Sequence, residues 1–248
     1  MRLPAPFRAA GDHIAIDLDG ACALFTTRGG GVSRGPYESL NLGRWTDDDP
    51  AAVKANRERV ATLAGLSEEN LAQGRQVHGT HVRRLPAAPA RGEEAALADG
   101  QATVADRVAP IVLVADCLPV ALAGDGGVAM LHAGWRGLAG GVLEEGVRAL
   151  RGLGVSGALS AAIGPGAGGC CYEVGEEVRA AFAEDGDAID GRRLDLKRVA
   201  RRRLEAAGVE TVHDAGLCTL CTDESLFFSH RRDGGVTGRQ AGLAWRVS

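Results

Sequence analysis

The chain has no excess of positive charge and almost no lysine. Its 28 basic side chains are outnumbered by 32 acidic ones among 248 residues, giving a formal net charge of −4. Because dedicated nucleic-acid-binding domains usually carry a basic excess, this balance argues against DNA or RNA as a partner. Lys54 and Lys197 are the only lysines, a bias that we attribute to codon composition. The arginine-rich stretch 198–203 is interpreted as a solvated helix face.

Long apolar runs are also missing. The longest one covers residues 108–115 and ends at Asp116, whereas a transmembrane helix needs about 20 apolar residues. Residues 1–20 contain no apolar stretch of the length typical of a secretory signal. We therefore expect a cytoplasmic protein with no membrane partner.

Linkers, internal repeats and low-complexity segments are absent from the sequence as well. Glycine is abundant, at 36 of 248 residues, but follows no G-X-Y period, which excludes a collagen-like chain. Hydrophobic residues make up 45% of the chain and charged residues 24%, which are ordinary globular values. Since a domain usually has roughly 100–200 residues, we expect residues 1–248 to form one domain.

The six cysteines lie at positions 22, 117, 170, 171, 218 and 221. In a cytoplasmic chain, cysteines are more often reduced, catalytic or metal-bound than joined in disulfides. Cys218 and Cys221 form a C-x-x-C motif, but a zinc ribbon needs a second such pair and the sequence has none. Cys170 and Cys171 are adjacent, a spacing that rarely permits a disulfide. We interpret these four as small core or loop thiols.

Apolar periodicity predicts helices and strands in mixed order. Helices are expected over residues 50–64, 138–150, 173–183 and 195–207. Strands are expected over residues 21–26, 111–115, 118–123, 128–132, 158–163, 226–229 and 242–247. The turn signal Asp125-Gly126-Gly127 predicts an antiparallel hairpin between two of these strands. Hairpins combined with strand–helix alternation favour a mixed α/β (α+β) layer structure over a purely parallel sheet.

Three short segments place potential metal ligands at strand ends or tight turns. They read R-Q-V-H-G at residues 75–79, A-D-C-L-P at 115–119 and L-H-A-G-W-R-G at 131–137. His78, Cys117 and His132 offer two imidazoles and one thiolate, a donor set that zinc prefers. The hairpin would bring Cys117 and His132 together across neighbouring strands. The alternative is a buried cysteine with two structural histidines, because free cysteine is commonly buried.

The same segments resemble the YfiH (laccase-domain) family, formerly described as multicopper polyphenol oxidases. The resemblance extends to S-L-N-L-G at residues 39–43, I-G-P at 163–165, C-Y-E-V-G at 171–175, and F-F-S-H-R-R and T-G-R within 227–239. It implies a single domain of packed mixed sheets flanked by helices. It also implies a zinc-dependent enzyme that phosphorolyses adenosine, inosine, guanosine and methylthioadenosine and deaminates adenosine.

The resemblance implies one zinc ion per chain, held by His78, Cys117 and His132. Such an ion activates water for attack on C6 of adenosine, so Cys117 and His132 are also expected to be catalytic. Asp116 and Glu173 are candidates for proton transfer. For Asp116 the alternative is a carboxylate that only fixes the turn beside a ligand.

Phosphorolysis requires an anion site, built from backbone N–H groups, a helix N-terminus or arginines. The sequence has no Walker motif, and the candidate phosphate-binding side chains are Arg28, Arg136 and Arg231. Arg136 is favoured because it follows a bend at Gly134 and precedes an expected helix. Asn41 and Gln76, which lie in the resembling motifs, complete the expected substrate-binding set.

Other functions stay open. Cys117 acting as a metal-free nucleophile with His132 as its base would make a hydrolase or amidase, and the resemblance also covers a proposed editing of peptidoglycan precursors. Copper-dependent phenol oxidation needs many histidines, and the chain has 6. A binding module with structural zinc needs four protein ligands, one more than converge here. The expected partners are purine nucleosides and phosphate, and the expected state is a monomer or a homodimer.

Overall fold

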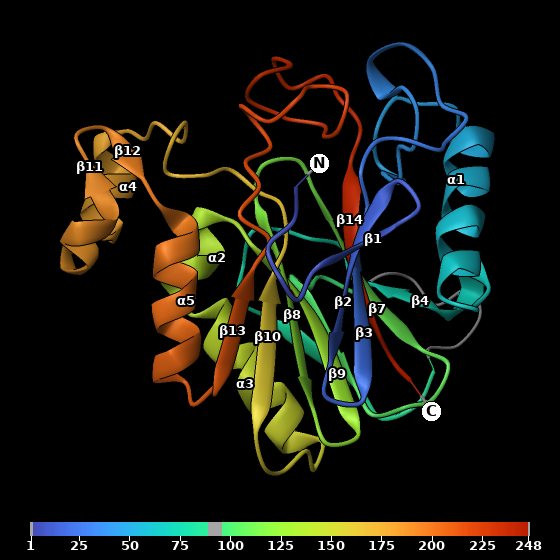
Figure 1. Cartoon of the computed structure of the whole chain (residues 1–248), viewed down its shortest axis with the longest axis horizontal. Coiled ribbons are helices and arrows are strands. Elements are labelled where there is room, and N and C mark those ends of the chain that lie inside the picture. Colours follow the sequence, from blue (N-terminus) through green and yellow to red (C-terminus); the bar gives the residue numbers. More distant parts are fainter. Residues whose placement is uncertain (1, 89–95, 248) are drawn as a thin grey trace.

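Figure 1 shows the computed structural model of the chain, which describes residues 2–88 and 96–247. The first sheet has the order β1-β2-β3-β14-β7-β4, with bounds β1 (Arg8–Ala10), β2 (His13–Leu18), β3 (Ala21–Phe25), β14 (Gln240–Arg246), β7 (Ala109–Val114) and β4 (Leu71–Gln73). The second sheet has the order β13-β10-β8-β9-β6-β5, with bounds β13 (Thr211–Asp214), β10 (Leu159–Ile163), β8 (Leu118–Gly124), β9 (Gly127–Ala133), β6 (Gly100–Thr103) and β5 (Val82–Leu85). Both sheets mix parallel and antiparallel pairs.

Helices cover the outer faces of the two packed sheets. In Figure 1, α1 (Pro50–Leu63) lies beside the first sheet, and α2 (Trp135–Gly140), α3 (Val142–Gly152) and α5 (Leu196–Ala206) lie beside the second. A peripheral unit contains α4 (Glu176–Ala181), η3 (Ala183–Ala188), β11 (Ile189–Asp190) and β12 (Arg193–Leu194). Two short 3-10 helices are η1 (Gly35–Tyr37) and η2 (Glu68–Asn70). The expected α+β fold of packed mixed sheets flanked by helices is confirmed.

The two sheets meet through aliphatic and aromatic side chains. In β9, Val128 and Met130 belong to the cluster between the sheets, whereas Leu131 packs on the helix side. This alternation follows from the pleat of a strand, in which successive side chains point to opposite faces. A Cβ at Gly242 of β14 would lie 2.7 Å from Cβ of Pro119 and 2.9 Å from Sδ of Met130. Glycine at this position therefore permits the close approach of the sheets.

The expected hairpin is confirmed. β8 and β9 pair antiparallel from Leu118↔Ala133 to Gly124↔Gly127, so Asp125 and Gly126 form a two-residue turn. Gly126 has φ +74, a left-handed conformation that glycine adopts without strain.

Two expected helices differ from the structure. The helix expected at 138–150 is divided into α2 and α3 by Gly141, whose φ is +96. The helix expected at 173–183 is reduced to α4, because Glu173 forms a bridge with Arg193 instead. The expected helices at 50–64 and 195–207 correspond to α1 and α5.

The strand expected at residues 226–229 is wrong. Phe227 and Phe228 are fully buried, which explains the apolar signal, but the segment is a loop. Its backbone is satisfied by side chains: Gln240 accepts a hydrogen bond from Phe228 N–H at 2.8 Å, and Arg232 donates to the Phe227 carbonyl at 2.8 Å. Burial of aromatic anchors and strand pairing produce the same apolar pattern in a short sequence.

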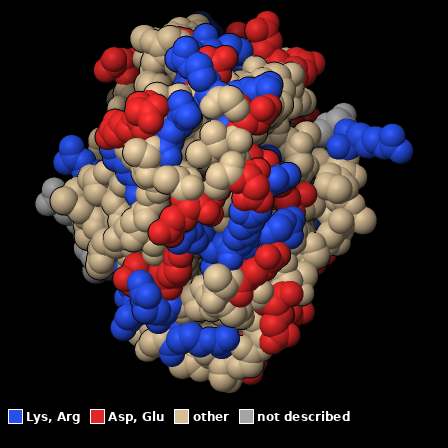
Figure 2. All heavy atoms as spheres, turned by 90° about the vertical axis from the view of Figure 1, so that its left-hand side faces the viewer, with Lys and Arg blue, Asp and Glu red and all other residues tan. Residues whose placement is uncertain are grey.

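Figure 2 shows acidic and basic side chains intermixed on the face of the molecule that includes α4 and α5. Arg202 pairs with Asp187, and Arg203 pairs with Asp185 at 3.2 Å. The arginines of α5 are thus part of a mixed-charge surface, in line with a solvated helix face. None of the helices in residues 2–88 and 96–247 combines the length and the apolar character needed to cross a bilayer.

Candidate metal centre and active-site cavity

His78, Cys117 and His132 converge at one end of the interface between the sheets. Cys117 directly precedes β8, and His132 lies opposite Pro119 in β9. The centroid of the His78 ring is 4.9 Å from that of His132. One ligand atom from each of the three residues lies within 4.8 Å of the other two. The convergence expected from the sequence is therefore present.

Each sheet contributes to this centre. His132 shares the row of Val128 and Met130 along β9, so its side chain points toward the first sheet. His78 belongs to the loop that follows β4 of the first sheet. The centre therefore joins the two sheets where their strands end.

Asp99 organises the two histidines and was missed by the sequence analysis. Its carboxylate is fully buried and accepts hydrogen bonds from the backbone N–H groups of Val77, His78 and Gly79 at 3.1, 2.9 and 2.7 Å. These bonds hold His78 at φ +59. Asp99 Oδ1 also lies 2.8 Å from Nδ1 of His132, which leaves Nε2 of that ring free for a ligand. The only sequence signal for Asp99 is a carboxylate directly before a short buried strand.

The charges of the centre favour a metal-binding thiolate. Burial opposes ionisation of Cys117, but His132 and His78 lower the pKa of its thiol to about 6. Burial also opposes protonation of His132, but Cys117 and Asp99 raise the pKa of its ring to about 9. The thiolate is the metal-binding form of cysteine, and zinc binding would release the proton of His132. One thiolate and two neutral imidazoles then fit a zinc ion with one coordination position left open.

Glycine is required at position 134 because a side chain would not fit there. A Cβ at this position would lie 2.9 Å from Sγ of Cys117 and 2.9 Å from Cδ2 of His78. The chain passes from β9 to α2 at Gly134, but its φ is −73, a value that any residue adopts, so this turn does not itself require glycine. The H-A-G-W segment therefore contains glycine because the chain passes directly against the side chains of Cys117 and His78.

Asp116 fixes the turn that presents Cys117. It has φ +92, which is rare for a residue with a side chain. One carboxylate oxygen accepts a hydrogen bond from Thr219 Oγ1 at 2.7 Å, and the other accepts one from Arg231 N–H at 2.9 Å. With both oxygens engaged, the geometry favours the alternative in which this carboxylate holds the turn.

The centre lies in the wall of a cavity of about 420 Å³, a size usual for small-molecule sites. Its other walls carry aromatic and cationic side chains. The aromatic ones are Trp45, Trp135 and Tyr172, and the basic ones are Arg136, Arg231, Arg239 and His230. Of these, Arg136 and Arg231 were expected as site residues, whereas Trp45, Trp135, Tyr172, Arg239 and His230 were missed by the sequence analysis.

Three of the expected substrate-binding residues line this cavity: Gln76, Arg136 and Arg231. The guanidinium of Arg136 stacks 4.2 Å from the Trp135 ring and lies 3.7 Å from Glu177. That of Arg231 stacks 4.5 Å from the Tyr172 ring. Helix α2 has only 6 residues, so the expected contribution of a helix N-terminus at Arg136 is weak. The Gln76 amide is paired with the backbone of Leu113 at 2.7 and 2.8 Å.

Arg28, Asn41 and Glu173 are not among the cavity-lining residues. Arg28 donates to the Glu38 carbonyl at 2.7 Å and stacks on Phe228. Asn41 is fully buried and holds the backbone of Gly43 and Arg239, which do line the cavity. Glu173 is exposed, and its carbonyl accepts a hydrogen bond from the Arg231 guanidinium. These three residues shape the surroundings of the cavity.

Comparison with known proteins gives consistent matches over nearly the whole chain. The profile of the family described as multi-copper polyphenol oxidoreductase laccase matches residues 22–247. A Pseudomonas aeruginosa protein named purine nucleoside phosphorylase is 44% identical over 236 residues, spanning 90% of this chain and 92% of its own length. The Escherichia coli protein named purine nucleoside phosphorylase YfiH is 39% identical over 240 residues, spanning 92% and 95%.

Solved structures show the same fold. The crystal structure of the Bacillus licheniformis hypothetical protein YfiH superimposes with a TM-score of 0.89 at 31% identity, covering 98% of this chain and 100% of its own. The crystal structure of the Neisseria meningitidis protein NMB0706 superimposes with a TM-score of 0.85 at 36% identity, covering 96% and 100%.

Proposed function

This chain belongs to the YfiH family, and we propose that it is a zinc-dependent purine nucleoside phosphorylase acting in the cavity beside His78, Cys117 and His132. The observation that carries the proposal is the convergence of these three side chains in the wall of a cavity that also holds aromatic and cationic groups. The names of the relatives supply the substrate class. We infer that residues 1–248 act as one cytoplasmic domain, as a monomer or a homodimer.

Zinc is the metal that the donor set favours. When bound, the ion would supply a Lewis acid that polarises water or a substrate oxygen. Asp99 orients His132 and the loop of His78, and Asp116 orients Cys117. Copper is named in the family description, but a multicopper oxidase needs several histidine-rich sites, and the chain has 6 histidines in total.

Phosphorolysis requires the purine ring and a phosphate to be held on either side of the ribose C1′. The aromatic faces of Trp45, Trp135 and Tyr172 suit stacking with a purine. Arg136 and Arg231 suit phosphate oxygens, because a guanidinium forms paired charge-assisted hydrogen bonds with them. A phosphate oxygen then bonds to C1′ while the glycosidic C–N bond breaks, and the purine leaves with the bonding electrons and takes up a proton.

Deamination of adenosine is a second activity of the same proposal. Water replaces the amino group at C6 and ammonia leaves, so this reaction needs no phosphate. The two activities therefore place different demands on the arginines of the cavity.

A metal-free cysteine hydrolase is the second candidate, and one specific observation favours it. Cys117 lies beside His132, which in turn lies 2.8 Å from Asp99. This order of nucleophile, base and orienting carboxylate is that of cysteine hydrolases. An amidase acting on peptidoglycan precursors would use it without a metal.

A nucleoside panel tests the proposed function. We expect the purified protein to convert purine nucleosides and to leave pyrimidine nucleosides unchanged. Failure to convert any purine nucleoside, in the presence of zinc and phosphate, would reject the phosphorylase. Turnover of an amide substrate by protein freed of metal would establish the cysteine hydrolase instead.

A further inference from the structure

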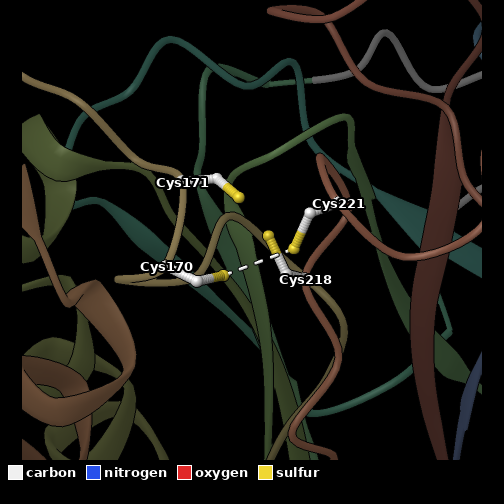
Figure 3. A group of neighbouring side chains, drawn as sticks. All are labelled: Cys170, Cys171, Cys218 and Cys221. Atoms are coloured by element: carbon white, nitrogen blue, oxygen red, sulfur yellow. Dashed lines mark hydrogen bonds between the residues drawn. The ribbon is translucent and has the colours of Figure 1, made fainter.

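A second group of potential metal ligands lies outside the proposed active site. Cys170 and Cys171 belong to the loop between β10 and α4, and Cys218 and Cys221 belong to the loop between β13 and β14. Their four sulfur atoms all lie within 4.8 Å of one another. Figure 3 shows the four side chains directed toward a common point, with Cys170 Sγ and Cys221 Sγ 3.4 Å apart.

We propose that these four cysteines bind a second, structural zinc ion, separate from the ion at Cys117. Structural zinc sites are closed, with four protein ligands in a tetrahedron. A zinc–sulfur distance of about 2.3 Å places the sulfurs about 3.8 Å apart, and the four sulfurs here all lie within 4.8 Å of one another. The sequence analysis interpreted these residues as small core or loop thiols, and the structure brings all four together. The partner of the C-x-x-C motif is the adjacent pair Cys170-Cys171, for which motif spacing gives no signal.

The two loops are already held together by their backbones. Gly166 N–H donates to the Leu217 carbonyl at 3.3 Å, and Thr219 N–H donates to the Gly166 carbonyl at 3.2 Å. Gly168 N–H donates to Sγ of Cys218 at 3.3 Å. A backbone N–H directed at sulfur stabilises a thiolate, the form that coordinates metal. The ligands are therefore brought together before any ion binds.

Glycines in the first loop make room for the sulfurs. A Cβ at Gly168 would lie 3.1 Å from Sγ of Cys170 and 3.3 Å from Cβ of Cys218. A Cβ at Gly169 would lie 2.8 Å from Cβ of Asp195, at the start of α5. This glycine-rich segment has no phosphate-binding pattern in the sequence, and close packing at the cysteine cluster accounts for it.

A pairwise disulfide is the main competitor, since Cys170 and Cys221 are both exposed and their sulfurs are close. A disulfide accounts for two of the cysteines. It does not account for the convergence of all four, which includes the buried Cys218 and the half-buried Cys171. Tetrathiolate binding of a single ion uses every member of the cluster.

The four-cysteine cluster lies next in sequence to two residues that shape the active-site cavity. Tyr172, which follows Cys171, lines that cavity. Thr219, which follows Cys218, donates to Asp116 beside Cys117. The second zinc ion would therefore fix two loops that frame the cavity without touching the substrate. We expect its loss to raise the KM for nucleoside several-fold and to lower the melting temperature.

Metal analysis of protein purified under reducing conditions tests the proposal without any activity assay. We expect two zinc ions per chain in the wild type, one in Cys221→Ser, one in Cys117→Ala and none in the double variant. Cys22→Ala, which removes a buried cysteine of β3 far from both groups in the sequence, serves as the control and keeps two. Retention of the wild-type zinc content by Cys221→Ser would overturn the proposal.

Cobalt substitution of Cys117→Ala separates the second site from the first. With only the four-cysteine cluster left, we expect the intense sulfur-to-cobalt absorption of a tetrathiolate, and its loss in Cys117→Ala/Cys170→Ser. Circular dichroism checks that these variants fold. A Cys170–Cys221 disulfide in non-reduced peptides of freshly purified protein, together with no cobalt absorption, would contradict the inference. Neither result depends on nucleoside turnover, so the second site can fail while the proposed function stands.

Discussion

Asp99 is the single residue on which the geometry of the proposed catalytic site depends most. It binds three consecutive backbone N–H groups around His78 and the ring of His132. Replacing it by asparagine puts an N–H₂ group where an acceptor is needed. We expect Asp99→Asn to weaken zinc binding at this site about 10–100-fold, measured by competition with a chelator in a Cys221→Ser background. Asp125→Asn, in the exposed hairpin turn, is the matched control; equal affinities in the two variants would remove Asp99 from this role.

Arg136 tests the phosphate part of the proposal. Its guanidinium is 58% exposed and is paired only loosely with Glu177, at 3.7 Å, so it is available to an anion. Loss of a charge-assisted hydrogen bond costs about 1.5–3 kcal/mol, which corresponds to about 10–100-fold in affinity. We expect Arg136→Ala to raise the KM for phosphate by that factor and largely to spare deamination of adenosine. A parallel loss of both activities with a lowered melting temperature would assign Arg136 to structure instead.

The three candidate metal ligands could be predicted from the sequence, but only some of the residues around them could. His78, Cys117 and His132 each stand in a short motif of unusual composition, and the hairpin turn predicted that two of them meet. Asp99 has no such motif, because its role arises from contacts with segments that lie far away in sequence. The cysteine cluster was hidden for the same reason, since its two halves belong to separate loops.

At the scale of elements, local signals predicted the helices α1 and α5 and the strands β3, β7, β8, β9, β10 and β14. The strands β1, β2, β4, β5, β6 and β13 were not predicted. The hairpin of β8 and β9 follows from a turn that suits only a few residues and from strands buried on both faces. The expected helix at 138–150 was interrupted because Gly141 adopts a left-handed conformation. The segment 226–229 was mistaken for a strand because buried phenylalanines are required there by tertiary packing. Long-range contacts, which no local window contains, decide such cases.

The ion pair between α1 and η2 provides a stability test at this scale. Arg57 of α1 is 1% exposed and donates to Glu68 at 2.8 Å. Breaking a buried pair leaves an unpaired charge and costs about 3 kcal/mol. We therefore expect Glu68→Gln to lower the unfolding free energy by about 3 kcal/mol at neutral pH, measured by urea denaturation. Glu58→Gln, at an exposed pair with Lys54, should change it by less than about 0.5 kcal/mol.

The difference in unfolding free energy between wild type and Glu68→Gln should depend on pH in a definite direction. Burial opposes ionisation of Glu68, but Arg57 and Arg44 lower the pKa of its carboxyl below the usual value of 4.5. A lowered folded-state pKa stabilises the fold above the unfolded-state pKa, and the stabilisation is lost as the pH falls through the folded-state value. The difference in unfolding free energy between wild type and Glu68→Gln should thus become smaller in acid. A gap that is constant or widens below pH 4.5 would contradict the assignment.

For the whole molecule, the arrangement of layers explains where the chemistry is placed. The proposed catalytic centre takes His132 from the second sheet and His78 from a loop of the first, so it exists only when the two sheets are packed together. The sequence predicted mixed sheets with flanking helices, but β8 and β9 are the one pair of neighbouring strands that it predicted. The order of strands depends on contacts across the sheet interface, such as those of Gly242 with Pro119 and Met130.

Identification of the products formed from adenosine and phosphate tests the central claim most directly. We expect wild-type protein to release adenine and ribose 1-phosphate in equal amounts. Removal of zinc should stop the reaction and its return should restore it, and Cys117→Ala should be inactive with an unchanged circular dichroism spectrum. The absence of ribose 1-phosphate under these conditions, or its undiminished formation by zinc-free protein or by Cys117→Ala, would contradict a zinc-dependent purine nucleoside phosphorylase.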